Sequence, residues 1–366
     1  MSNVKRKIIL EDGTTFVGQA FGGSSNKVGE VIFFTGMTGY QEMLTDPSYH
    51  RHIVVMTNPT IGTYGMNRED SQSFSPFIHG MIVREMIDEP SNFRSVESLD
   101  QYLKKYDIPG IAGIDTRMLT TYIRNNGQQK GYIVDEHIDS VEQAKEMVEN
   151  DISPFEKITT TKPYIIPGNG NRIVVIDLGI KQSMLRELIK RNFHITVVPY
   201  HYTEEQILHF QPDGIFISNG PGNPEDIPET VKTVKSLFGK LPIFAVGLGH
   251  LIFAIATGAK TKRRKVGQFG FNFPVLDKER NRTWMTTKSS SFTVDETSIH
   301  NADLSVTFRG LNDRAIEGFV HRKYPAFSVQ FHPEGAPGSN ETTFLFDEFE
   351  QLVENNKKNG GLYDYA

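Results

Sequence analysis

From residue 172 onward, strand-like runs alternate with helical patterns, and this alternation limits the possible folds more than any other feature of the chain. The apolar runs RIVVIDL, HITVVPY, DGIFISNG and LPIFAV each fit a buried strand. Between them lie amphipathic segments such as KQSMLRELIKRN, whose apolar residues recur at helical spacing. Strands that alternate with helices are typical of βαβ units. We therefore predict an α/β domain with a doubly wound, parallel sheet.

The first part of the chain has a different, β-rich pattern. Two strand-like runs flank an Asp12-Gly13 turn, which is a hairpin signal, and GEVIFFTG and RHIVVMTNP follow as further strand-like runs. A helix is expected over DTRMLTTYIRNNG, with Asp115 as its cap and Gly127 at its end. The segment TTTKPYIIPGNGN shows neither the periodicity of a helix nor the alternation of a strand, and it is interpreted as a linker. The expected organisation is a β-rich domain over residues 1–155, a linker over 156–171 and the α/β domain over 172–360.

The charge of the 366-residue chain argues against nucleic acid as a partner, because the formal net charge is -5. One basic run, residues 260–265, departs from this balance and is interpreted as a solvated loop. No apolar run is long enough to cross a bilayer, so no membrane partner is expected. The N-terminus lacks the pattern of a signal peptide, and we expect a cytoplasmic protein.

The sequence contains no cysteine. Disulfides, thiolate nucleophiles and cysteine-ligated metals are therefore excluded, and we predict no metal site in this chain.

The segment PIFAVGLGHLIFAIATGAK, residues 242–260, has the strand, sharp turn and helix of a nucleophile elbow. Ala245 and Gly249 flank the apex residue, Gly247, where close backbone packing demands small side chains. The start of the helix offers N–H groups that can stabilise negative charge. Gly247 itself has no side chain that could attack a substrate.

Two other interpretations of this segment are open. The turn can be a plain strand-to-helix connection in which glycine eases tight packing. A dinucleotide-binding loop is disfavoured, because Ile252 stands where its third glycine is required. A later strand-like run, AFSVQFHPEG, favours a catalytic interpretation, since it ends at His332 with Glu334 two residues further on. A base that is oriented by a carboxylate is what a nucleophile site requires.

Three motifs now stand in order: SNGPGNP, an elbow followed by LGH, and FHPE. In this order they resemble the class I glutamine amidotransferase domain. In the first half, GEVIFFTGMTGYQEMLTDPSY, PSNFR and GIAGIDTRMLTTYIR resemble the N-terminal domain of the carbamoyl-phosphate synthase small chain. The resemblance covers nearly the whole chain, up to LFDEFEQLVE in the last helix.

The resemblance implies a reaction and a partner. In that family a cysteine at the elbow attacks the amide of glutamine, a histidine moves protons and a glutamate orients the histidine. Ammonia passes to a large chain, which uses bicarbonate and ATP to make carbamoyl phosphate for arginine and pyrimidine synthesis. No cofactor is therefore expected in this chain, because ATP and metal would be bound by the large chain.

Carried over residue by residue, the resemblance makes His332 the base and Glu334 its orienting carboxylate. It places the oxyanion hole at the backbone N–H groups of Gly222 and Leu248. Four further positions match the glutamine site, with the first of them reaching over from the N-terminal domain: Ser48, Lys181, Gly220 and Phe292.

Four departures from the family pattern fall on this one site. Gly247 replaces the cysteine, and Leu251 replaces the glutamine of LGHQ. In KSSSF, where the family usually has QNHGF, Ser289 replaces an asparagine and Ser291 a glycine. The segment VGQFGFNFPV keeps only part of FGHxGxNHPV. An isolated substitution explains Gly247 but not the other three departures, so we infer relaxed selection on the glutamine site.

We therefore expect a ligase subunit, the small chain of a carbamoyl-phosphate synthase, that has lost its own glutaminase activity and for which glutamine is a doubtful ligand. Two alternatives stay open. A residual glutaminase would need another nucleophile, and the hydroxyls of Ser289 to Ser291 are the concentrated source of one. A non-catalytic regulator would sense a different ligand in a pocket that contains Leu251.

Overall fold

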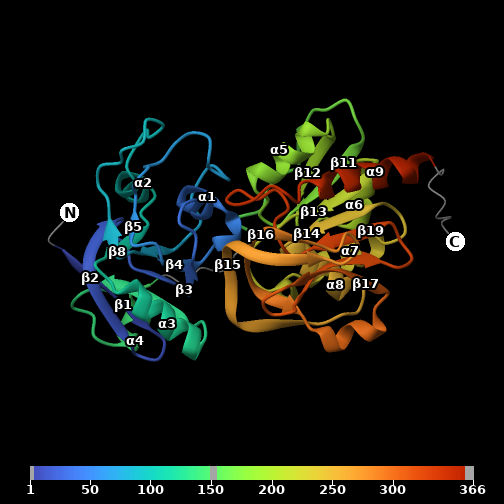
Figure 1. Cartoon of the computed structure of the whole chain (residues 1–366). Helices are drawn as coiled ribbons and strands as arrows, with labels where there is room; N and C mark the ends of the chain where they lie inside the picture. The colour runs from blue at the N-terminus through green and yellow to red at the C-terminus, as the bar shows by residue number, and fades with distance from the viewer. Residues whose placement is uncertain (1–3, 149–154, 359–366) are drawn as a thin grey trace. The chain divides into compact units, whose positions relative to one another are not determined.

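The computed structural model describes residues 4–148 and 155–358. The chain divides into two compact units. Unit 1 comprises Met1–Ile152 and Lys265–Gly270, and unit 2 comprises Ser153–Arg264 and Phe271–Ala366. In Figure 1 the main segment of unit 1 runs from blue to green, and unit 2 runs from green to red.

Unit 1 is built around a closed barrel in the strand order β1-β2-β8-β6-β4-β3-β9. The hairpin predicted around Asp12-Gly13 is confirmed, because β1 and β2 pair antiparallel. The helix predicted after Asp115 is also confirmed as α3: the Asp115 carboxylate accepts from Met118 N–H, and the helix ends at Gly127. The barrel is filled by aliphatic side chains such as Ile53.

The elements of unit 1 are β1 (Lys5–Leu10), β2 (Thr15–Gly22), β3 (Lys27–Phe34), α1 (Tyr40–Thr45), η1 (Pro47–Tyr49), β4 (His52–Met56), β5 (Thr60–Ile61), β6 (Gly80–Ile82), β7 (Glu85–Met86), α2 (Leu99–Lys105), β8 (Pro109–Ala112), α3 (Thr116–Asn126), β9 (Lys130–Asp135) and α4 (Val141–Glu146).

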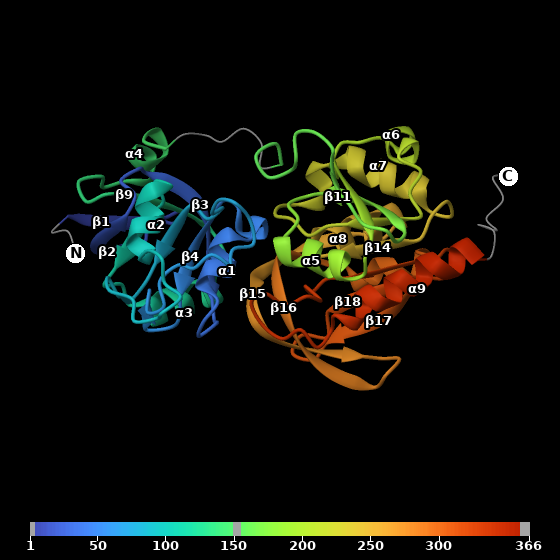
Figure 2. The same ribbon diagram turned by 90° about the horizontal axis from the view of Figure 1, so that it is seen from above.

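Unit 2 contains the predicted α/β sheet, with ten strands in the order β10-β12-β11-β13-β14-β19-β18-β17-β15-β16. The neighbours from β12 to β19 pair parallel, and β18 and β17 extend the sheet antiparallel. Buried side chains of α5 and α9, such as Leu188 and Phe349, pack on one face of the sheet. Figures 1 and 2 show α7 and α8 on the other face, so the sheet is doubly wound as predicted.

The elements of unit 2 are β10 (Tyr164–Ile166), β11 (Arg172–Asp177), α5 (Gln182–Lys190), β12 (His194–Pro199), α6 (Glu204–His209), β13 (Gly214–Ile217), η2 (Pro224–Asp226), α7 (Pro228–Leu237), β14 (Ile243–Val246), α8 (Leu248–Ala256), β15 (Thr261–Asp277), β16 (Arg282–Val294), η3 (Glu296–Asn301), β17 (Leu304–Gly310), β18 (Ile316–His321), β19 (Ala326–Val329) and α9 (Phe344–Lys358).

Three segments differ from the sequence-based expectation. Part of the segment expected as a linker forms β10, which pairs antiparallel with β12 and so belongs to the sheet of unit 2. The basic run 260–265 is not a loop, because β15 begins at Thr261. Within β15, Lys265–Gly270 belongs to unit 1, so the residues of unit 2 are not continuous along the chain. The consecutive charged residues at the start of β15, with two neighbours both exposed, gave no alternating pattern that would have predicted a strand.

Within the described ranges, no helix combines the length and the apolar character that a membrane span requires.

Candidate active site

The predicted elbow forms between β14 and α8, at the carboxyl end of a central strand. Its apex, Gly247, has a φ of 61° and a ψ of -114°, a conformation that L side chains rarely adopt. Gly249 lies so close to β13 that a Cβ there would be 2.6 Å from the carbonyl oxygen of Ile217. The tight turn and the small flanking residue of a nucleophile elbow are thus present, and the apex has no side chain.

The empty apex lies beside His332. A Cβ built on Gly247 would be 3.6 Å from His332 Nε2 and 3.2 Å from the Cβ of Asn219. A side chain at this position would therefore start within reach of the imidazole. The backbone places a nucleophile position and a base together, as the order of the motifs predicted.

Lys181 contacts both the predicted base and its predicted carboxylate. It is fully buried at the start of α5, and its ammonium donates to Glu334 Oε1 at 2.7 Å and to the carbonyl oxygen of Gly335 at 2.9 Å. The same Nζ is 3.3 Å from His332 Nδ1. Glu334 Oε1 lies 3.7 Å from His332 Nδ1, beyond hydrogen-bond distance. The carboxylate therefore contacts the lysine more closely than the histidine.

This contact fixes the tautomer of His332. An ammonium has three donors and no acceptor, so Nδ1 must accept from Lys181. Burial and the Lys181 charge hold the pKa of His332 well below its ordinary value, and the ring is neutral at neutral pH. A neutral ring that accepts at Nδ1 carries its proton on Nε2. His332 is thus set to donate from Nε2 rather than to accept a proton there.

The partner of Nε2 is Ser289. Its Oγ lies 3.0 Å from His332 Nε2, so the hydroxyl accepts from the ring in this tautomer. Ser289 lies on β16 and is 7% exposed. The structure therefore brings one of the predicted hydroxyls to the base. The proton on Nε2 points the wrong way for activating that hydroxyl as a nucleophile.

The two backbone N–H groups predicted for the oxyanion hole belong to Gly222 and Leu248. Gly222 lies in the SNGPGNP loop with a φ of 89°, and Leu248 is the first residue of α8. Neither N–H donates to any of the described residues. Unpaired N–H groups at a helix start and in a loop can donate hydrogen bonds to an anionic oxygen.

The remaining predicted substrate residues of unit 2 lie on α8, on β16 and in the loop after β13. Leu251 lies one turn into α8 and is 1% exposed, and Ser291 is on β16, two residues after Ser289. Alternate residues of a strand face the same side, so the two serines share a face. The N–H of Phe292 donates to Ser290 Oγ at 3.1 Å. Gly220, after β13, approaches Leu178 so closely that a Cβ would be 2.2 Å from its carbonyl oxygen.

Ser48 belongs to unit 1. It lies in η1, where its N–H donates to the carboxylate of Asp46 at 2.8 Å. Its contribution to a glutamine site stays a prediction.

Sequence analysis missed a buried ion pair next to the site. Lys288, the first residue of KSSSF, places its Nζ 2.7 Å from Glu317 Oε1, and both side chains are 3% exposed or less. Arg264 lies 3.6 Å from the same carboxylate oxygen. Burial raises the pKa of Glu317, and the Lys288 charge opposes that rise. The sequence signal for this ion pair is Lys288 itself, because the resembled family usually has glutamine at this position.

Lys288→Met is expected to lower the free energy of unfolding by about 3 to 5 kcal/mol at neutral pH, because it leaves Glu317 buried without its nearest cation. The loss should shrink as the pH falls. The folded-state pKa of Glu317 is already raised, and the variant raises it further, so the cost is full above that pKa and fades once the carboxyl is protonated. Urea unfolding at two pH values measures both effects.

The matched control is Lys323→Met, which breaks an exposed pair with Asp303. Its expected cost is below about 1 kcal/mol. An equal loss for Lys288→Met at both pH values would contradict the charge argument and point to packing instead.

Comparisons with known proteins match both halves of the chain. Residues 8–133 match the family described as carbamoyl-phosphate synthase small chain, CPSase domain, and residues 174–352 match glutamine amidotransferase class-I. The "Carbamoyl phosphate synthase small chain" of Oceanobacillus iheyensis is 48% identical over 365 residues, 99% of this chain and 100% of that protein. The "Carbamoyl phosphate synthase pyrimidine-specific small chain" of Halalkalibacterium halodurans is 48% identical over 97% of this chain and 98% of its own length.

Proposed function

Because this chain belongs to the carbamoyl-phosphate synthase small-chain family, we propose that it is a small chain that assembles with a large chain but does not itself hydrolyse glutamine. One observation carries the proposal. The apex of the elbow is Gly247, and a Cβ on it would lie 3.6 Å from His332 Nε2. The site keeps the place for a nucleophile and lacks the nucleophile.

The contacts of His332 are consistent with this conclusion, but the resembled family keeps a lysine at the position of Lys181, so the loss of activity rests on Gly247. A triad base must accept a proton from the nucleophile and return it to the leaving group. Here the Lys181 ammonium lies 3.3 Å from Nδ1, a contact that favours the tautomer with its proton on Nε2. Holding a triad histidine in the wrong tautomer lowers kcat by about ten-thousandfold in serine proteases. The orienting carboxylate contacts Lys181 instead of the ring.

In this role the chain contributes structure to a synthase that uses free ammonia or ammonia from another source. We place the product in arginine and pyrimidine synthesis in the cytoplasm. This chain would hold no cofactor, and ATP and metal would be bound by the large chain.

The chain is expected to form a stable complex with a carbamoyl-phosphate synthase large chain. The reason is that residues 8–133 of unit 1 match the CPSase domain of the carbamoyl-phosphate synthase small chain, a family whose name implies a large-chain partner. Size-exclusion chromatography of the mixture at micromolar concentration tests assembly. The complex should then make carbamoyl phosphate from ammonia and not from glutamine. Two separate peaks would contradict the proposal.

A second function is favoured by one contact, the 3.0 Å between Ser289 Oγ and His332 Nε2. If the imidazole changed tautomer, it would be placed to take the proton of this hydroxyl, and Ser289 would become the nucleophile of a residual glutaminase. Glutamate release that Ser289→Ala abolishes would support this function over the first.

A further inference from the structure

We propose that a pocket between η3 and β17 of unit 2 binds a small organic phosphate monoester. The pocket has a volume of about 500 Å³. That size lies within the range of small-ligand sites. Its lining residues are separate from those around Gly247 and His332, so the proposal does not depend on whether glutamine is hydrolysed.

The pocket has an excess of positive charge. Lys278, Arg309 and Arg322 line it, and Glu296 is the carboxylate among its lining residues. Three cations against one carboxylate leave a net charge of +2 when His300 is neutral. The neighbouring Lys323 and Asp303 form an ion pair with each other at 2.7 Å and cancel.

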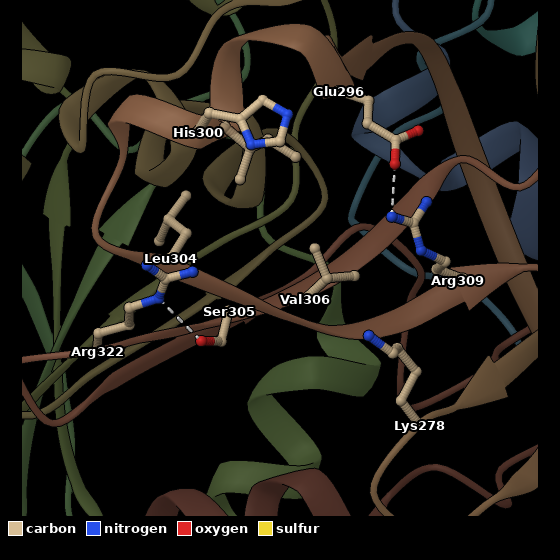
Figure 3. Close-up of a pocket in the computed structure, with 9 residues that line it drawn as sticks. Lys278, Glu296, His300, Leu304, Ser305, Val306, Arg309 and Arg322 are labelled. Carbon is tan, nitrogen blue, oxygen red and sulfur yellow. Dashed lines mark hydrogen bonds and ion pairs between the residues drawn. The ribbon is translucent and has the colours of Figure 1, made fainter.

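Two of the three cations have donors to spare. Arg309 is occupied, because its guanidinium contacts Glu296 at 2.6 Å and the carbonyl oxygen of Arg314 at 2.8 Å. Arg322 donates from Nε to Ser305 Oγ at 3.1 Å. Figure 3 shows Arg309 turned toward Glu296 and Arg322 turned toward Ser305. Among the described residues, the terminal nitrogens of Arg322 and the ammonium of Lys278 have no hydrogen-bond or ion-pair partner.

Apolar side chains complete the lining. Leu304 and Val306 lie on β17, and Ile299 lies on η3. Leu304 is 1% exposed and lies at the base of the pocket, whereas Val306 and Ile299 are half-buried. The pocket therefore offers contact to an apolar body as well as to an anion.

The net charge of the pocket and the geometry of its donors favour a phosphate monoester as the ligand. A phosphate monoester carries nearly two negative charges at neutral pH and has three strong acceptor oxygens. It would balance the net charge of +2, whereas a monocarboxylate would leave one positive charge unmatched. The planar fork of Arg322 suits bidentate contact with phosphate oxygens, and Lys278 adds a point charge. The ester group would lie on Leu304 and Val306.

The test is isothermal titration calorimetry of the full chain with phenyl phosphate, inorganic phosphate and succinate. Phenyl phosphate combines a dianion with an apolar ring and is expected to bind most tightly. Inorganic phosphate should bind about tenfold more weakly, because it lacks the apolar contact. Succinate that bound as tightly as phenyl phosphate would overturn the assignment to phosphate. Absence of binding by all three at millimolar concentration would overturn the site.

Variants locate the binding. Arg322→Ala and Lys278→Ala are each expected to weaken phenyl phosphate binding about tenfold, since each removes a charged donor. The matched control is Lys232→Ala, an exposed lysine on α7, which should leave binding unchanged. Equal binding by wild type and both pocket variants would place the ligand elsewhere and contradict the proposal. Circular dichroism spectra of the variants establish that they fold.

Discussion

The purified chain is expected to release no measurable glutamate from glutamine. Removing the nucleophile of a catalytic triad costs on the order of a millionfold in kcat. The sequence has no cysteine, and the apex of the elbow is Gly247. What remains is a pair of unpaired N–H groups on Gly222 and Leu248 and a neutral imidazole on His332. A glutamate assay in the presence and absence of the large chain measures the result.

Two variants separate the explanations of any glutamate that is found. Release that His332→Ala abolishes would show a working site and contradict the expectation. Release that Ser289→Ala abolishes as well would identify the hydroxyl 3.0 Å from the ring as the nucleophile. Release that neither change affects would come from a contaminating glutaminase, which a second purification step would remove.

The backbone of this site could be predicted from sequence because local patterns determine it. The strand and helix around Gly247 follow from apolar runs and small residues, and the position of His332 follows from the strand that precedes it. Both lie at the carboxyl ends of neighbouring parallel strands, β14 and β19, and the sheet order brings such ends together. The family resemblance added the roles of these residues.

The side-chain partners could not be predicted in the same way. Lys181 and Glu334 are 153 residues apart in the sequence, and their contact depends on how α5 meets the turn after β19. The Lys288–Glu317 pair likewise joins two strands, β16 and β18, that are far apart in the sequence. The sequence shows Glu334 two residues after the histidine, but it does not show that a buried ammonium contacts both side chains. The tautomer of His332 follows from that ammonium alone.

Recovery of glutaminase activity is expected to require three substitutions rather than one. Gly247→Cys would restore a thiol whose Cβ starts 3.6 Å from His332 Nε2, next to the Leu248 N–H that is predicted for the oxyanion hole. The cysteine would have to adopt the φ of 61° and ψ of -114° at the apex, at a cost of about 1 to 3 kcal/mol in stability. Burial and Lys181 would also disfavour the imidazolium that a thiolate needs beside it. Little glutaminase activity should return to the single variant, because Leu251 and Ser289 still leave glutamine without the hydrogen-bond partners that the resembled family provides.

The triple variant Gly247→Cys, Leu251→Gln, Ser289→Asn should exceed Gly247→Cys by at least about tenfold in kcat/KM. Both variants share the strain at the apex and the charge near His332, so their ratio isolates the substrate contacts. Leu251 is a buried hydrocarbon where the resembled family has an amide, and Ser289 is shorter than the asparagine it replaces. Each missing hydrogen bond leaves a polar group of glutamine unpaired at about 1 to 3 kcal/mol. Two of them, about 2 to 6 kcal/mol together, correspond to between about thirtyfold and about twenty-thousandfold. Equal activity of the two variants, with similar thermal unfolding, would mean that the glutamine pocket is intact and that the nucleophile is the one element lost.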